Sequence, residues 1–152
     1  MRISLLLCFI LINLSTCTPA ETPVTESIPI TGRNFTNQMN GYSESVMITN
    51  GAVKTIYVSG QISSAPDFES QMREVLDKLE KALNNVGADM QDIVKMNTYI
   101  VDYQPELLDI FRSVRKEVMG DEKMPASTLV GVTALARPEW LIEIDAVAVV
   151  TD

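Results

Sequence analysis

The sequence predicts an α+β domain in which two helices cover one face of a mixed β-sheet. Short runs rich in β-branched and aromatic residues alternate with two segments whose apolar residues recur at helical spacing. Their order is hairpin, helix, strand, helix, strand, strand, which is typical of a sheet covered on one side. At 152 residues, 46% of them hydrophobic, the chain has the size of a single domain with one core.

The N-terminal segment is predicted to be an export signal. Within Met1 to Cys17, Arg2 precedes an apolar run of roughly a dozen residues, which is too short to span a bilayer. Leu14-Ser15-Thr16-Cys17 resembles a bacterial lipobox, with Cys17 as the lipid attachment site, whereas Thr18-Pro19-Ala20 offers a conventional cleavage site. We expect an exported protein, either soluble or anchored by a lipid: periplasmic or membrane-anchored in a bacterium, secreted in a eukaryote.

Residues 18–40 are predicted to be a tether and a poorly ordered lead-in. They are rich in Thr, Pro, Glu, Ser and Asn and show little periodicity. The folded domain is therefore expected to span residues 41–152.

A β-hairpin is predicted to open the domain. Val46 to Thr49 and Lys54 to Ser59 flank the turn dipeptide Asn50-Gly51. Gly60, at the end of the second strand, allows another backbone or a ligand to approach closely.

Two amphipathic helices follow. The first is expected to end at Gly87, and the second to begin at Pro105 and end at Gly120. Their apolar stripes are Met72, Val75, Leu76, Leu79, Leu83 and Val86 in the first helix, and Leu107, Leu108, Phe111, Val114 and Val118 in the second.

Three further strands are predicted over residues 92–101, 128–133 and 141–150. In the last one, Glu143 and Asp145 share one face. Because this strand is apolar on both faces, Glu143 is a candidate for a carboxylate in a cleft. The alternative is that both acids are edge-strand charges that block aggregation.

Because both predicted helices cover the same face of the sheet, the other face is left open. Proteins usually hide such an apolar face by association, so we expect a symmetric homo-oligomer.

Composition excludes several classes of function. Histidine is absent, which rules out imidazole bases, Ser-His and Cys-His pairs and His-ligated zinc. The two cysteines, Cys8 and Cys17, precede the domain, so no cysteine nucleophile or disulfide belongs to it. A net charge of −8 disfavours nucleic acid and anionic membranes as partners. No phosphate-binding, zinc-protease or dinucleotide-binding motif is present, and we expect no metal and no organic cofactor.

Six short segments occur in an order and at spacings that together resemble the RidA (YjgF) family over about Tyr42 to Val150. They are Tyr42-Ser43, Ser59-Gly60-Gln61-Ile62, Val86-Gly87-Ala88, Asp92-Ile93-Val94-Lys95, Pro125-Ala126-Ser127-Thr128 and Ile142-Glu143-Ile144-Asp145-Ala146-Val147-Ala148.

The resemblance implies a chorismate-mutase-like α+β fold and a homotrimer with a ligand cleft at each subunit interface. Active members hydrolyse reactive enamines and imines, such as 2-aminoacrylate, to ketoacids and ammonia without a cofactor. By resemblance, Tyr42 is the cleft tyrosine, Ser59 and Gly60 line the site with backbone, and Glu143 holds the attacking water. A partly desolvated carboxylate suits this proton transfer.

The chain departs from the active deaminases in one segment, which by resemblance binds the substrate. The active deaminases read Pro-Ala-Arg-Ser there, and this chain reads Pro125-Ala126-Ser127-Thr128. Ser127 occupies the arginine position, and a hydroxyl cannot replace a guanidinium that pairs with the substrate carboxylate. Arg112 lies near the place of the family's helix-two asparagine. Arg112, Arg115 or Arg137 could supply the missing charge.

Two hypotheses follow. In the first, the protein is an exported hydrolase of imines or enamines with Glu143 as the acid-base residue. In the second, it is a trimer that has lost deaminase activity and binds a small ligand or a protein partner.

Overall fold

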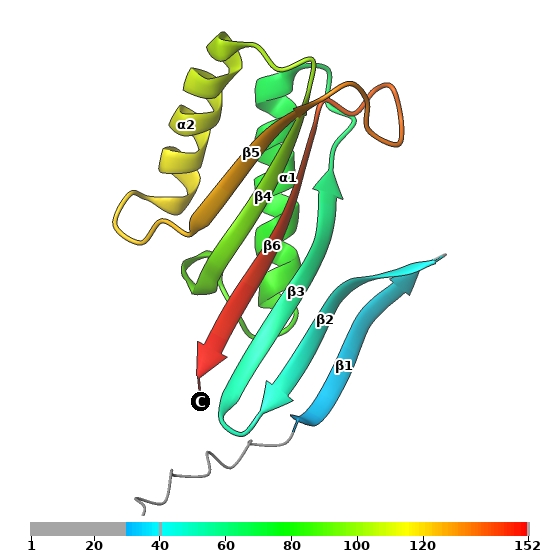
Figure 1. The fold of residues 1–152 in the computed structure, drawn as a ribbon, viewed down its shortest axis with the longest axis vertical. Helices are drawn as coiled ribbons and strands as arrows, with labels where there is room; N and C mark the ends of the chain where they lie inside the picture. The colour runs from blue at the N-terminus through cyan, green and yellow to red at the C-terminus, as the bar shows by residue number, and fades with distance from the viewer. Residues whose placement is uncertain (1–29, 40, 152) are drawn as a thin grey trace, which may run out of the picture.

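The computed structural model describes residues 30–39 and 41–151, which form one six-stranded sheet in the order β1-β2-β3-β6-β4-β5 with two helices (Figure 1). The strands are β1 (Ile30–Met39), β2 (Tyr42–Asn50), β3 (Val53–Ile62), β4 (Ile93–Val101), β5 (Ala126–Val132) and β6 (Ile142–Thr151), and the helices are α1 (Phe68–Asn84), the 3-10 turn η1 (Met90–Asp92) and α2 (Pro105–Met119). The predicted α+β mixed sheet is confirmed.

Most neighbouring strands run antiparallel, and β4 and β5 alone among the described pairs run parallel. Helix α2 connects β4 to β5, as a parallel pair requires a crossover. The predicted hairpin is formed by β2 and β3. Asn50 pairs with Val53, and Gly51 takes the positive φ of 60° that the tight turn demands.

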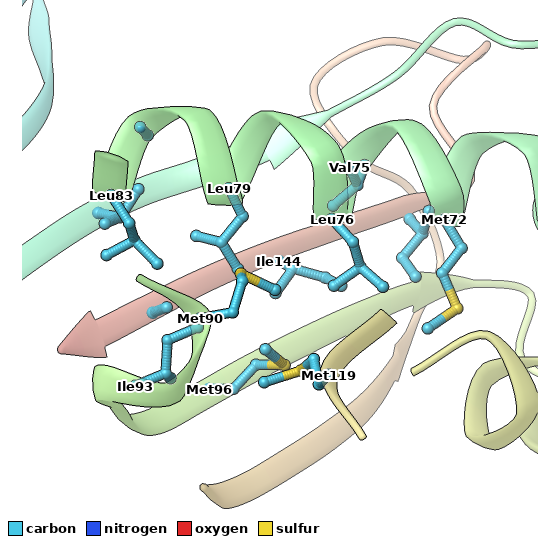
Figure 2. Close-up of a cluster of buried hydrophobic side chains, with 14 of the residues drawn as sticks. Met72, Val75, Leu76, Leu79, Leu83, Met90, Ile93, Met96, Met119 and Ile144 are labelled. Carbon is cyan, nitrogen blue, oxygen red and sulfur yellow. The ribbon is translucent and has the colours of Figure 1, made fainter. Parts of the chain in front are cut away.

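Both helices pack on the same face of the sheet. Helix α1 begins at the N-cap Asp67, whose carboxylate accepts a hydrogen bond from the Ser70 amide, and it lies behind β3 and β6 in Figure 1. Its apolar stripe points at the inner residues of the sheet and at Met119, the last residue of α2 (Figure 2). Leu79 is fully buried, which stabilises the fold by roughly 2 to 3 kcal/mol.

The core is continuous across both helices. Alternate residues of β6 are buried beneath α1, so the intervening residues face away from the helices. The buried apolar residues of the sheet side are Ile56, Val58, Ile93, Met96, Ile100, Ile142, Ile144, Ala146 and Ala148, and those from α2 are Phe111, Val114 and Met119. The prediction that two helices cover one face and leave the other open is confirmed.

The prediction that the lead-in is poorly ordered through residue 40 is wrong for Ile30–Met39. These residues form β1, which pairs with β2 along its whole length, so the folded region begins before residue 41. The pattern failed because β1 is exposed on nearly every residue and is held by backbone hydrogen bonds instead of by burial.

The predicted signal segment, Cys17 and the first part of the tether lie outside the described residues. Within the described part of the chain, no helix has both the length and the apolar character needed to cross a membrane.

Candidate active site

An open cleft of about 420 Å³ lies where β3 ends and β6 begins. Its walls come from four parts of the chain: the start of β2, the end of β3, the loop before β6 and the start of β6. The lining residues are Tyr42, Ser59, Gly60, Ile62, Ala136, Trp140 and Glu143. The structure thus brings together Tyr42, Ser59, Gly60 and Glu143, four of the residues selected from the sequence.

Glu143 does not lie on an edge strand. Strand β6 is paired with β3 on one side and β4 on the other, so the alternative of an edge charge that blocks aggregation is wrong. The side chain alternates with the buried Ile142 and Ile144, and it therefore projects from the open face of the sheet.

Gly60 makes room for the Glu143 carboxylate. The pairing of β3 with β6 is irregular between Val58 and Gln61, as in a β-bulge, and Gly60 falls within this irregularity. A Cβ atom at Gly60 would lie 1.8 Å from Glu143 Oε1. Its φ is not positive, so close packing against Glu143 and not backbone conformation is what requires glycine here.

The two hydroxyl residues of the cleft are held differently. Ser59 Oγ donates a 2.7 Å hydrogen bond to the Ser43 carbonyl and is thereby fixed to β2. Tyr42 is 54% exposed, and its hydroxyl donates to Met39 Sδ at 3.6 Å. Because a thioether is a weak acceptor, the Tyr42 hydroxyl can exchange this contact for a ligand at little cost.

The environment of Glu143 favours its neutral form. Burial, followed by the negative charge of Asp145, raises the pKa of Glu143 above its usual value of 4.5. Asp145 itself accepts a 2.8 Å hydrogen bond from Asn97 Nδ2 on β4. The charge of Asp145 is also the main cause that raises the pKa of Tyr99, which pairs with Glu143 across the two strands. The open face therefore carries a polar group of four residues centred on the β6 carboxylates.

Sequence reasoning missed the wall formed by the loop before β6. Trp140 donates from Nε1 to Ser64 Oγ at 3.3 Å, and the Arg137 guanidinium lies 5.6 Å from the centre of the Trp140 ring. A single tryptophan beside an Arg-Pro step was the only signal in the sequence. Loop residues carry no periodicity, so their place in the cleft follows from tertiary structure alone.

Gln71 fixes that loop against α1. This buried amide donates to the carbonyls of Ala65 and Glu139 at 2.9 and 2.8 Å, and its oxygen accepts from the Leu141 amide at 2.8 Å. The hydrogen bonds join α1 to the residues just before β6. Gln71 therefore positions the wall of the cleft opposite β3.

The structure does not bring Ser127, Thr128 or Arg112 to this cleft. Ser127 and Thr128 lie on the edge strand β5, with β4 between them and β6. Ser127 is level with the buried Met96 and so faces the helices, on the opposite face of the sheet from Glu143. Thr128 lies on the open face and accepts a hydrogen bond from Lys95 Nζ.

The three arginines with a predicted anion-binding role differ in their surroundings. Arg112 is exposed on α2. Arg137, in the loop beside the cleft, lies 3.8 Å from the Glu139 carboxylate. Arg115 is half-buried on α2, and its Nη1 donates to Ser127 Oγ at 3.4 Å. Only Arg115, of these three, contacts the serine at the predicted arginine position.

Across residues 30–39 and 41–151, no three acidic, histidine or cysteine side chains gather closely enough to hold a metal ion. The polar groups that line the cleft are one carboxylate, two hydroxyls, the indole N–H of Trp140 and backbone groups.

A family model described as Endoribonuclease L-PSP matches residues 33–150. The chain belongs to this family. It is the RidA (YjgF) family, whose members include curated relatives named as RutC family proteins. YjgH of Escherichia coli is 32% identical over 95 residues, which are 59% of this chain and 72% of the relative. PYRAB12510 of Pyrococcus abyssi is 30% identical over 115 residues, 70% of this chain and 84% of the relative.

Solved structures of RidA-family proteins share the fold. Rv2704 of Mycobacterium tuberculosis, described as a member of the YjgF/YER057c/UK114 family, is 30% identical with a TM-score of 0.67, covering 78% of this chain and 100% of that chain. NMB1025 of Neisseria meningitidis, 24% identical, has a TM-score of 0.68 over 80% of this chain and 97% of its own, which shows the common fold.

Proposed function

We propose that this RidA-family protein hydrolyses reactive imines and enamines to a carbonyl product and ammonia without a cofactor. The observation that carries the proposal is Glu143, a half-buried carboxylate with a raised pKa, packed against Gly60 in an open cleft. Hydrolysis of an imine needs a group that accepts a proton from water and returns it to nitrogen. A carboxylate whose pKa is moved toward neutrality by burial suits both steps.

The proposed reaction has two stages, addition of water and loss of ammonia. Water adds to the imine carbon while the carboxylate of Glu143 takes one of its protons, which yields a carbinolamine after protonation of nitrogen. Glu143 then carries the proton of the new hydroxyl to the nitrogen, the C–N bond breaks, and ammonia leaves as the carbonyl forms. An enamine first gains a proton on carbon to become an imine. Tyr42, whose hydroxyl has only a weak partner, positions the substrate.

The working assembly is proposed to be a homotrimer with clefts between subunits. Two features support it. The sheet face away from the helices is uncovered in one chain and carries half-buried residues such as Tyr99 and Val147. In addition, the family resemblance places Ser127 in the substrate-binding segment, while Ser127 lies roughly 10 Å from β6, across two strand spacings and on the other face of the sheet. A small substrate that contacts both segments therefore needs two copies of the chain.

The description of the family model names a ribonuclease activity, and the properties of this chain do not favour it. The net charge is −8 and the chain contains no histidine for acid-base cleavage of RNA. Within the cleft, the charged side chain is the carboxylate of Glu143, which repels phosphate. A small imine is a better fit than a polyanion.

The test is a panel of imines generated by an amino-acid oxidase, with release of ammonia followed in the presence of the protein. We expect faster decay with the natural chain and loss of the acceleration in Glu143→Gln and Glu143→Ala. Asp145→Asn is the matched control, because Asp145 lies on the same strand and is bonded to Asn97. Absence of acceleration for every imine tested contradicts the proposal.

Ser127, which stands where the active deaminases have an arginine, favours one second candidate: a trimer that binds a small ligand without turnover. It predicts ligand binding that survives Glu143→Ala, together with no imine hydrolysis by the natural chain.

A further inference from the structure

Trp140 is the largest side chain that lines the cleft, and it lies in the loop between β5 and β6 (orange in Figure 1). Ile62 and Ala136 extend this apolar wall, so the carboxylate of Glu143 shares the cleft with an apolar surface. Neither the addition of water nor the transfer of a proton needs such a surface. The ligand group that an apolar wall stabilises is one that is itself apolar.

The backbone on both sides of Trp140 is fixed. The side-chain amide of Gln71 donates to the Glu139 carbonyl at 2.8 Å and accepts from the Leu141 amide at 2.8 Å, and these are the two peptide groups that flank the tryptophan. The Trp140 amide donates to the Arg137 carbonyl at 3.2 Å and closes a turn whose second residue is a proline, which favours that position. The path of the loop at Trp140 is thus set before a ligand arrives.

The Trp140 ring is held at one edge and on one face. Its Nε1 donates to Ser64 Oγ at 3.3 Å, and the Arg137 guanidinium lies over the ring at 5.6 Å from its centre. The segment that carries Ser64 is itself ordered, because the hydroxyl of Ser63 accepts a 3.0 Å hydrogen bond from the Ala65 amide. With its N–H paired and one face covered, the indole offers a ligand its other face. A ring ordered in advance loses little entropy when a ligand packs against it.

The cleft is larger than an imine with a short side chain needs. A compound the size of 2-aminoacrylate fills roughly 100 Å³, and an imine that carries a benzyl group fills roughly 200 Å³. The cleft of one chain measures about 420 Å³. Half of this volume accommodates the larger compound, so space remains for a neighbouring subunit at the mouth.

Trp140 and Glu143 are close enough for one ligand to contact both. They are three residues apart, so their Cα atoms are separated by at most about 10 Å, and both line the same cleft. Stacked rings prefer separations of about 4.5 to 7 Å between their centres. A substrate can therefore place its reacting carbon at the carboxylate and a ring, attached through one carbon atom, against the indole.

We propose that Trp140 forms a subsite for the side chain of the substrate, and that the protein acts on imines whose reacting carbon carries an aromatic side chain in preference to imines with short side chains. The aromatic group packs on the free face of the indole and holds the imine carbon beside Glu143. The inference rests on the proposed function for the reaction, whereas the contact of an aromatic group with Trp140 does not depend on turnover.

The binding test uses 3-phenylpropanamide and propanamide. These neutral amides differ by one phenyl ring, and each carries oxygen and nitrogen on one carbon, as the reaction intermediate does. Because Trp140 is the only tryptophan of the chain, its fluorescence, excited at a wavelength that a phenyl ring does not absorb, reports the contact directly. We expect 3-phenylpropanamide to change the emission of the full-length oligomer saturably and to bind at least about tenfold more tightly than propanamide. By titration calorimetry, Trp140→Leu should lose this difference.

The kinetic test compares the imines of phenylalanine and alanine, both generated by an amino-acid oxidase. In the natural chain, kcat/KM should be at least about tenfold higher for the phenylalanine imine. Trp140→Leu should lower kcat/KM by about tenfold for the phenylalanine imine and by less than about twofold for the alanine imine. Trp140→Phe, which keeps a ring, should retain most of the preference. A merely structural role of Trp140 would lower the rates for both imines alike.

The outcomes separate this inference from the proposed function. Equal affinity for the two amides, a preference for the phenylalanine imine that survives Trp140→Leu, or an equal loss for both imines overturns the subsite. Binding of 3-phenylpropanamide that depends on Trp140, while no imine is hydrolysed, supports the subsite and contradicts the hydrolase. Hydrolysis of both imines with the same kcat/KM supports the hydrolase and overturns the subsite.

Discussion

Replacing Gly60 with alanine should displace the Glu143 carboxylate without unfolding the protein. The new Cβ would lie 1.8 Å from Glu143 Oε1, 2.6 Å from Cδ and 2.8 Å from Cγ. Non-bonded carbon and oxygen atoms need about 3.3 Å, so the carboxylate oxygen must move by about 1.5 Å. Since a misplacement of about 1 Å can cost on the order of 100-fold in rate, we expect Gly60→Ala to lower kcat for imine hydrolysis by about that factor.

The stability of Gly60→Ala should change little by comparison. Overpacking costs about 1 to 3 kcal/mol, but the obstacle is the flexible end of a side chain, and loss of glycine's freedom in the unfolded chain returns about 0.4 to 1 kcal/mol. Urea unfolding should therefore show a loss of no more than about 2 kcal/mol. Gly32→Ala is the matched control, because no atom lies within 4 Å of its added Cβ. Full activity in a folded Gly60→Ala protein would refute the role given to the Glu143 carboxylate.

Two further predictions concern stability. Because the folded protein raises the pKa of Glu143, the native state holds its proton to higher pH than the unfolded state, and stability falls as pH rises from about the ordinary value of 4.5 to the raised one. The melting temperature of Glu143→Gln should therefore be close to that of the natural chain below this pH window, and higher than that of the natural chain at neutral pH. A difference in melting temperature that does not vary with pH contradicts the raised pKa. Gln71→Leu leaves three backbone partners unpaired and should cost about 3 kcal/mol in urea unfolding, whereas a loss below about 1 kcal/mol would show that the loop is held by other contacts.

Helices and central strands were predictable because burial leaves a pattern in the sequence. The stripe from Met72 to Leu83 is buried as the helical period required, and Pro105 and Gly120 lie at the two ends of α2. Gly87 and Gly120 take the positive φ values of 77° and 74° that suit glycine at the end of a helix. Where one face of an element is buried, its period identifies it.

Strand β1 could not be found by the same means. Phe35 and Met39 are 50% exposed, and neither face of the strand is buried in this chain. Its pairing with β2 is made by backbone groups, which every sequence possesses. Period-2 alternation is a signal of burial, and an exposed strand does not produce it.

The candidate site was predictable only in part. The close approach of Gly60 to Glu143 agrees with the glycine expected at the end of a strand and with the carboxylate expected in a cleft. The contact of Arg115 with Ser127 depends on how α2 lies over β5, and the place of Trp140 depends on the path of a loop. Neither arrangement follows from local spacing.

The most direct measurement is the pH dependence of kcat/KM for imine hydrolysis in the natural chain, Glu143→Gln and Asp145→Asn. If Glu143 is the base, the rate should fall below an apparent pKa that lies above 4.5, and Asp145→Asn should move this limb to lower pH because a neighbouring negative charge is removed. Glu143→Gln should abolish the limb together with the activity. An identical limb in all three proteins would contradict the assignment of proton transfer to Glu143.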